Sequence, residues 1–457
     1  MKKIILLTIF TLLSLLILRF ILIGFIAYTQ RPHLSAAQWY GNYFDRSMNE
    51  KEKLKIGFDS CETDTIKIVI GNEIMIKYNN LVDSLIKYKT FNYERLKYLT
   101  NMFLNGNSNG DPNLNIIMPK MKYDNCHLDL NGNKFETKIK LTGGQIDHYD
   151  TERRSLRIKS VKNILNMDAF NLYHPKSRMG GLYEWVGNLL LKREGLITLN
   201  TGYVSVTINK INKGIYFYQE HPTSNMLENN NKNPGLLFRL CLRDNKDKPF
   251  FYHKEDSMKL AVLKYYDKKK LKTKINFNKQ KLILEEKLNK FNNKEIPLDS
   301  LVSIEKLSKF SAVLNLINGH HSLWLGNCIF YLNPRTLLIE PIGREFGTSF
   351  YVPSYSLSIN PPYYLKEKRF QKEKLLEVLY PYSLDSIQTS FYEKKFKRDL
   401  KRVSDKSYLD SIFNSNFKEL KHRQFCLFKG DPSFKIFNKN IYYENQTLLK
   451  KCLEEDN

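Results

Sequence analysis

Hydrophobic and polar residues alternate along several short stretches in the middle of the chain, and this pattern predicts strands. A period of two, as in a half-buried strand, runs through Lys134–Leu141 and Arg154–Ser160, which Gly143-Gly144 separates. Further strands are expected from Ala169–Leu172, from the hairpin partners Tyr203–Ile208 and Ile215–Glu220, and from Gly235–Leu240. The middle of the chain is therefore expected to form a largely antiparallel sheet.

Two apolar runs farther along predict a second hairpin. Cys328–Leu332 and Thr336–Ile339 flank Asn333-Pro334-Arg335, and Asn-Pro favours a turn. Polar and ionisable residues stand before the first run and after the second: His321, Asn327, Glu340, Arg344 and Glu345. Loops at one end of a hairpin can hold such side chains in a cleft. A surface hairpin with charged ends is the alternative.

Helical spacing of apolar residues appears in five places. It predicts helices at Leu81–Leu104, Leu182–Lys192, near Gln280–Phe291, from Asp299 or Ser300 to Ile317, and through most of Lys366–Phe417. Asn245–Asp299 is otherwise rich in lysine and polar residues and is interpreted as a linker or insertion. The expected fold class is thus α+β.

The N-terminal stretch Ile4–Tyr28 carries a single charge, Arg19. Twenty-five helical residues reach about 37 Å, enough to cross a bilayer. Lys2 and Lys3 precede the run and no good cleavage site follows it, which favours an uncleaved anchor over a signal peptide. The expected localisation is a single-pass membrane protein whose soluble part lies outside the cytoplasm.

Composition narrows the classes of partner. The 457 residues are 42% hydrophobic and carry a net charge of +25, so the chain can bury a core and favours anionic partners. No sequence-specific nucleic-acid-binding pattern is present. None of the six cysteines forms a CxxC pair, which excludes a zinc ribbon and leaves disulfides open.

One strand and one helix suggest how an anion could be bound. Arg157 and Lys159 share a face of the strand that follows Gly143-Gly144, so point charges and backbone N–H groups could meet a phosphate together. Glu184, in the first turn of the helix Leu182–Lys192, could form an ion pair with Lys159. The alternative is that Arg157 and Lys159 meet water and that Glu184 only favours the helix dipole.

Five loose motifs in order give the chain a resemblance to the spore coat protein H (CotH) kinase family. They are a glycine turn with SLRIK, then FNLYHPKSR, LYEWVGNLLLKREGL, the YVSVTIN…GIYFYQEH hairpin, and HHSLWLGNCIFYLNP…EPIGREFG. The resemblance covers residues 130–350. It implies a bilobal, atypical protein-kinase-like fold that binds ATP with Mg²⁺ or Mn²⁺ and phosphorylates protein substrates.

The resemblance also assigns roles to individual residues. Lys159, and less directly Arg157, resembles the phosphate-binding position, with Glu184 as its helix partner and Glu220 near the nucleotide cleft. Asn327 resembles a metal-ligating Asn. Glu345 is the remaining candidate for the metal and for catalysis, and His321 could act as a base or be structural.

The chain departs from the family pattern at two positions. His321 stands near the position where the family generally has Asp, and Gly343-Arg344-Glu345 stands in place of an Asp-x-Asp-like pair. Two functions are therefore expected: a membrane-anchored kinase with a divergent active site, or a catalytically inactive, pseudokinase-like binding or assembly protein of the envelope. A basic surface protein that binds an anionic polymer or lipid is a further alternative. The expected partners are a protein substrate or an envelope protein.

The expected domain organisation follows this order. Residues 1–30 would form the transmembrane anchor and 31–129 a membrane-proximal segment of helices and loops. The kinase-like domain would span 130–350, with its first lobe at 130–242, a linker or insertion at 243–299, and the catalytic helix and hairpin at 300–350. Residues 351–457 would be mainly helical.

Overall fold

The computed structural model of the chain describes a defined set of residues, to which all structural statements below refer. They are 11, 13–15, 17–18, 61–90, 121–143, 148–149, 153–174, 181–242, 261–266, 268–293, 295–323, 327–347, 386–430 and 437–455.

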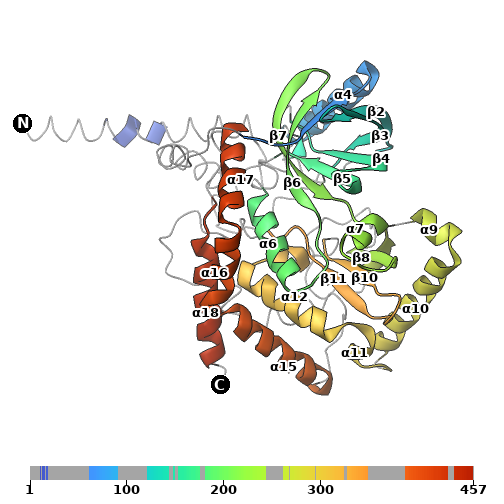
Figure 1. Cartoon of the computed structure of the whole chain (residues 1–457), viewed down its shortest axis with the longest axis vertical. Helices are drawn as coiled ribbons and strands as arrows, with labels where there is room; N and C mark the ends of the chain where they lie inside the picture. The colour runs from blue at the N-terminus through green and yellow to red at the C-terminus, as the bar shows by residue number, and fades with distance from the viewer. Residues whose placement is uncertain are drawn as a thin grey trace, which may run out of the picture.

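Seven strands close into a barrel in the first half of the chain (Figure 1). Around the barrel they follow the order β1-β2-β3-β4-β5-β7-β6, antiparallel except where β1 pairs with β6. Their bounds are Thr65–Val69 (β1), Asp124–Leu130 (β2), Asn133–Leu141 (β3), Leu156–Ile164 (β4), Met167–Tyr173 (β5), Thr201–Ile208 (β6) and Ile211–Glu220 (β7).

The barrel interior is apolar because alternate residues of each strand face inward. Ile66 and Ile68 of β1 lie in this core with Ile158 of β4 and Val204 of β6. Helix α4 (Asn72–Thr90) packs on the core through Tyr78, whose hydroxyl donates to the Ile139 carbonyl at 3.1 Å.

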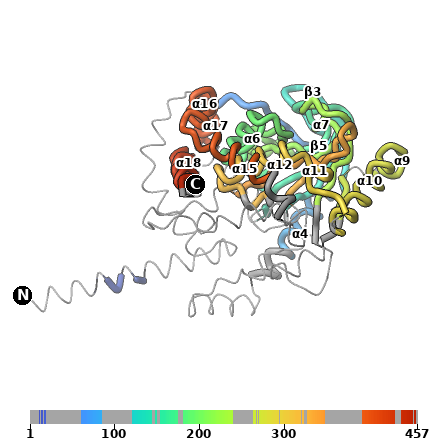
Figure 2. Tube along the Cα trace, turned by 90° about the horizontal axis from the view of Figure 1, so that it is seen from below, coloured from blue at the N-terminus to red at the C-terminus, as the bar shows by residue number. Residues whose placement is uncertain are grey.

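A second, four-stranded antiparallel sheet has the order β11-β10-β8-β9. The strands are Leu236–Leu242 (β8), Ala261–Tyr265 (β9), Ile329–Leu332 (β10) and Ile339–Ile342 (β11). Helices α9 (Lys268–Thr273) and α10 (Ile275–Asn292) follow β9 and lie at the edge of the molecule in both views (Figures 1 and 2). The short helix α7 (Ser224–Asn229) follows the barrel.

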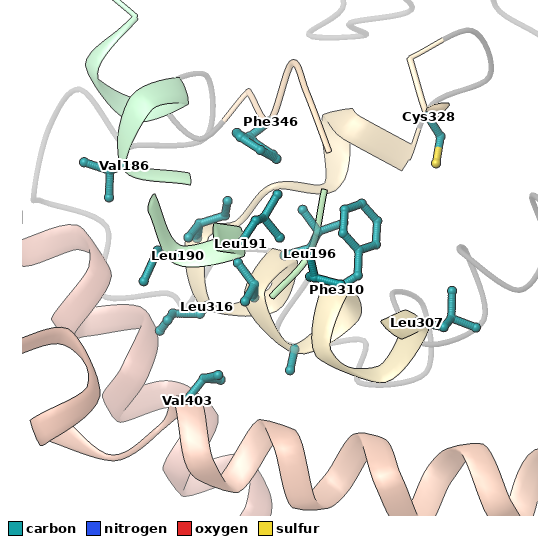
Figure 3. Close-up of a cluster of buried hydrophobic side chains, with 14 of the residues drawn as sticks. Val186, Leu190, Leu191, Leu196, Leu307, Phe310, Leu316, Cys328, Phe346 and Val403 are labelled. Atoms are coloured by element: carbon teal, nitrogen blue, oxygen red, sulfur yellow. The ribbon is translucent and has the colours of Figure 1, made fainter. Parts of the chain in front are cut away.

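The largest core lies where helices pack against one another and against the second sheet. Helix α6 (Leu182–Arg193) crosses α12 (Ile304–Ile317), and Leu190, Leu191, Phe310 and Phe346 are buried there (Figure 3). The surrounding helices are α11 (Leu298–Leu301), the 3₁₀ helix η4 (His320–Leu323), α15 (Ser386–Val403), α16 (Lys406–Ser415), α17 (Phe417–Gly430) and α18 (Asn440–Glu455).

The predicted bilobal, kinase-like fold is wrong, because the first sheet is a closed barrel beside a separate sheet and a set of helices. The strands that close it are β1 and β2, and all of their residues except Leu130 lie in the segment 31–129, which was expected to hold only helices and loops. β1 joins both ends of the sheet, since Ile66 pairs with Leu130 of β2 and with Val206 of β6.

The predicted transmembrane helix, part of the same fold prediction, needs correction too. Among the described residues, no helix combines the length and the apolar character that a bilayer crossing requires. This finding contradicts the predicted single-pass membrane localisation; most of the predicted span Ile4–Tyr28 lies outside the described residues.

Several local predictions are confirmed. The strand Lys134–Leu141 and the helix Leu182–Lys192 match β3 and α6 to within one residue at each end. The hairpin after Tyr203 is present, but its turn is tighter than expected and consists of Asn209 and Lys210, both with positive φ. In the second hairpin the returning strand begins at Ile339, where the predicted run Thr336–Ile339 ends.

Candidate functional site

Glu184 holds the backbone that follows β11. It lies in the first turn of α6, only 7% exposed, because the helix buries that side against β7 and the end of the second hairpin. One carboxylate oxygen accepts hydrogen bonds from Gln219 Nε2 at 2.9 Å and from the Glu345 N–H at 2.6 Å, and the other accepts from the Phe346 N–H at 3.1 Å. Glu184 therefore fixes the position of Glu345.

Gly343, which follows β11, occupies a position with no room for a side chain. A Cβ there would lie 2.6 Å from Leu191 Cδ1 and 2.7 Å from Phe346 Cε1. The first of these atoms belongs to α6 and the second to a ring buried in the same core. Packing thus accounts for a glycine at this position.

His321, Asn327 and Glu345 are brought together. His321 Nδ1 lies 2.8 Å from the Glu345 carbonyl oxygen, which can only accept, so Nδ1 carries the proton of this hydrogen bond. Asn327 Nδ2 donates to the His321 carbonyl at 3.0 Å. In neutral His321 the basic nitrogen is therefore Nε2.

Arg344 contacts both Asn327 and Glu345. Its Nε donates to the Asn327 carbonyl at 3.1 Å, and its guanidinium lies 3.7 Å from the Glu345 carboxylate. The side chain is 8% exposed. A buried cation beside Asn327 and Glu345 sets a positive potential at the point where the two predicted metal ligands lie.

His221, directly after β7, lies among four cations. Burial lowers the pKa of its imidazole first, and Arg157, Arg344, Lys140 and Arg239 lower it further. Its Nδ1 is buried and has no hydrogen-bond partner among the described residues. We call these five residues the basic cluster: Lys140, Arg157, His221, Arg239 and Arg344.

The members of the basic cluster come from both sheets. Lys140 and Arg157 are paired on β3 and β4 of the barrel, and burial followed by the charge of Arg157 lowers the pKa of Lys140. Arg239 comes from β8 and lies 5.9 Å from the ring centre of Tyr266, which in turn stands edge-on to His221. The second hairpin supplies Arg344. The cluster thus sits where the barrel meets the second sheet.

Several contacts hold the barrel side of the basic cluster in place. Arg157 Nε donates to Asn171 Oδ1 at 2.7 Å, and Lys140 Nζ lies 4.7 Å from the ring centre of Tyr123. The backbone N–H of His221 donates to the Ala169 carbonyl at 2.9 Å. The cations are therefore oriented before any ligand arrives.

Of the predicted cofactor residues, only Arg157 belongs to the basic cluster; Glu184 binds the backbone after β11, and Lys159 and Glu220 lie in neither place. Lys159 lies two residues beyond Arg157 on the same face of β4, but it is exposed, and no ion pair joins it to Glu184 in the described part of the chain. Glu220 is buried, and its carboxylate accepts from the Asn200 N–H at 2.9 Å and from Asn229 Nδ2 at 3.1 Å.

Comparisons with known proteins add no relative. No protein-family model matches the chain, and no curated protein matches it either.

The residues that the sequence analysis left out are Lys140, His221 and Arg239. The period of two in Lys134–Leu141 put Lys140 on the same outer face as Arg157, once the two strands were paired. No local signal marked His221 or Arg239, because their approach to Arg157 depends on the contact between the two sheets. Within the described ranges, no group of three or more His, Cys, Asp or Glu side chains could hold a metal ion.

Proposed function

We propose that the protein is a nucleotide-dependent phosphotransferase that binds ATP at the basic cluster and acts on a protein. The observation that carries the proposal is that the buried His221, whose Nδ1 has no hydrogen-bond partner in the described part of the chain, lies close enough to Lys140, Arg157, Arg239 and Arg344 for their charges to lower its pKa. Of the residues to which the resemblance to the CotH kinase family gave roles, only Arg157 lies in the basic cluster, and the proposal does not rest on the family's fold.

The basic cluster fits a polyphosphate in charge and in hydrogen bonding. Two or more cations that repel one another while partly desolvated are stabilised by an anion between them. Arginine offers paired donors to phosphate oxygens, and the cluster contains three arginines. A bound polyanion would also raise the pKa of His221 and let Nδ1 donate. ATP would supply the γ-phosphoryl group.

The group around Glu345 could serve the acceptor side. His321 holds its Nδ1 proton on the Glu345 carbonyl, so Nε2 can take the proton of an acceptor hydroxyl. The Arg344 guanidinium beside Asn327 and Glu345 would repel Mg²⁺ or Mn²⁺, so the Asn327 amide and the Glu345 carboxylate could hold the ion only together with the negative charge of the phosphates. Two protein oxygens suffice only if phosphate oxygens and water complete the shell, as is usual for Mg²⁺ at nucleotides.

A second candidate is a protein that binds the nucleotide without transferring phosphate. Two observations favour it: packing excludes a carboxylate side chain at Gly343, and Glu184 binds backbone N–H groups in place of a lysine. In this case the basic cluster keeps its ligand, while the group around Glu345 is structural.

The test is transfer of labelled phosphate from γ-labelled ATP to the chain itself or to a general acceptor protein, with Mg²⁺ or Mn²⁺. We expect incorporation by the wild type and a loss of at least about tenfold in Glu345→Gln. Glu136→Gln, an exposed residue on β3, is the matched control and should retain full incorporation.

Nucleotide binding without transfer in the wild type would establish the second candidate. Neither binding nor transfer would contradict both candidates.

A further inference from the structure

Helix α10 presents one side that the rest of the described chain leaves uncovered. Ile275 is 75% exposed and Leu282 is 58% exposed, although both are large apolar residues. With the exposed Lys279 they lie at i, i+4 and i+7, so they form one stripe along the helix. The opposite side holds Phe277, Leu284 and Phe291 in the core. α10 is therefore apolar on two sides, and only one of them is packed.

A cavity of about 430 Å³ that is open to solvent lies farther along α10. Ile283, Glu286 and Lys290 of α10 line it at the next positions along the same side of the helix, and Ile296, Thr336 and Leu338 line it from other elements. Its edge is rigid, because Lys287 Nζ donates to the carbonyls of Ser300 at 2.9 Å and of Leu337 at 2.7 Å. A cavity of this size can take a large side chain.

The surroundings of the stripe are strongly basic. Residues 268–292 contain nine lysines and two glutamates. Lys268, Lys272 and Lys274 are exposed just before and at the start of α10. The two glutamates are already engaged with lysines of the same helix, Glu285 with Lys281 and Glu286 with Lys290. The net charge around the stripe is therefore positive and calls for an acidic partner.

We propose that the stripe Ile275, Lys279 and Leu282, together with the adjoining cavity, docks an acidic polypeptide segment that carries large apolar side chains. Apolar side chains of the partner cover Ile275 and Leu282 and one enters the cavity, while its carboxylates meet the lysines of α9 and α10. Peptides that bind to a groove as a helix, or beside it as an extended strand, are recognised in this way through regularly spaced apolar side chains. The surface is separate from the basic cluster and does not depend on the proposed phosphoryl transfer.

The test is a fluorescence-anisotropy titration of the full chain with a short fluorescein-labelled peptide of Glu, Asp and Leu. We expect saturable binding to the wild type, and binding weaker by about tenfold or more in the double variant Lys279→Glu/Leu282→Ser. The matched control is Val161→Ser/Lys162→Glu, since Val161 is 98% exposed beside an exposed lysine on β4. The control should bind as the wild type does.

The proposal would be overturned if the acidic peptide did not bind, or if a counterpart peptide with Lys in place of Glu and Asp bound equally well. An equal loss of affinity in the control variant would also overturn it. So would binding to phosphatidylglycerol vesicles that needs Leu282 while the peptide does not bind. Circular dichroism of each variant confirms that the exposed substitutions leave the fold intact. Nucleotide binding, measured in parallel, should be unchanged in both double variants.

Discussion

Single residues around the end of β11 decide what the candidate site can do. Gly343 leaves room for Leu191 and Phe346, and Glu345 takes a left-handed backbone conformation with φ 53°. Glu184 stabilises that conformation by accepting the N–H groups of Glu345 and Phe346. The loop is therefore specified by packing on one side and by a buried carboxylate on the other.

Gly343→Ala tests the packing argument. The added Cβ would overlap Leu191 and Phe346, so we expect the free energy of unfolding to fall by about 1–3 kcal/mol. Gly71→Ala is the control, because nothing lies within 4 Å of a Cβ there. Urea unfolding of both variants gives the comparison. An equal or smaller loss in Gly343→Ala than in the control would contradict the packing account.

Glu220 makes stability depend on pH. Burial, with a smaller effect of Asp168, raises its pKa from 4.5 to about 7, against hydrogen bonds from Asn200 and Asn229 that lower it. The folded state keeps this proton where the unfolded state has lost it, so stability falls as pH rises from about 4.5 to about 7. Below about pH 4.5 Glu220 has no such effect on stability. Above about pH 7 its ionised, buried carboxylate lowers the free energy of unfolding by up to about 3 kcal/mol.

Glu220→Gln removes this pH dependence, because a glutamine side chain does not ionise. Relative to the wild type, the variant should be more stable at pH 8 than at pH 5 by up to about 3 kcal/mol, whatever its absolute stability. Chemical unfolding at the two pH values measures the difference. A wild type and variant with parallel pH profiles would show that the carboxyl is not held in its neutral form.

At the scale of elements, the disulfide Cys61–Cys426 joins the segment before β1 to α17. The same helix places Arg423 4.7 Å from the ring centre of Trp185 on α6 and 5.4 Å from that of Tyr203 on β6. α17 thus connects the barrel with the helix that carries Glu184. The disulfide secures this connection across 365 residues of sequence.

Cys61→Ser/Cys426→Ser should therefore lower the free energy of unfolding by about 2–5 kcal/mol. Thermal unfolding with and without dithiothreitol measures the effect. The reductant should destabilise the wild type by a similar amount and the double variant by less, because the variant lacks the Cys61–Cys426 bond. A wild type insensitive to reduction would contradict a stabilising role for this disulfide.

The sequence predicted elements best where hydrophobic spacing was regular and the partners were near in sequence. β3, α6 and the β6–β7 hairpin are of this kind. β2 was missed because Asn125, His127 and Asp129 make it look like a polar loop, although Cys126 and Leu128 face the barrel core. β1 was missed because Thr65–Val69 is short and lies far in sequence from its parallel partner β6.

For the whole molecule, sequence reasoning failed where distant segments meet. Closure of the barrel needs β1 to pair with β2 and β6 together, and no local pattern encodes that. The basic cluster is likewise a product of the contact between two sheets. Arg157 was identified from its strand, but its neighbours Arg239 and Arg344 come from the other sheet. Strand periodicity placed Lys159 on the same face of β4 as Arg157. It could not show that only the Arg157 end of that face lies beside the second sheet.

The most direct test of the central claim is the affinity of the full chain for a fluorescent ATP analogue in Arg157→Ala and Lys159→Ala. The two residues lie on one face of β4, and only Arg157 belongs to the basic cluster. We predict that Arg157→Ala weakens binding by about tenfold or more, as expected for a charged hydrogen bond, and that Lys159→Ala stays within about twofold of the wild type. Equal affinities in the two variants, or a greater loss in Lys159→Ala, would contradict the assignment of the phosphate site to the basic cluster.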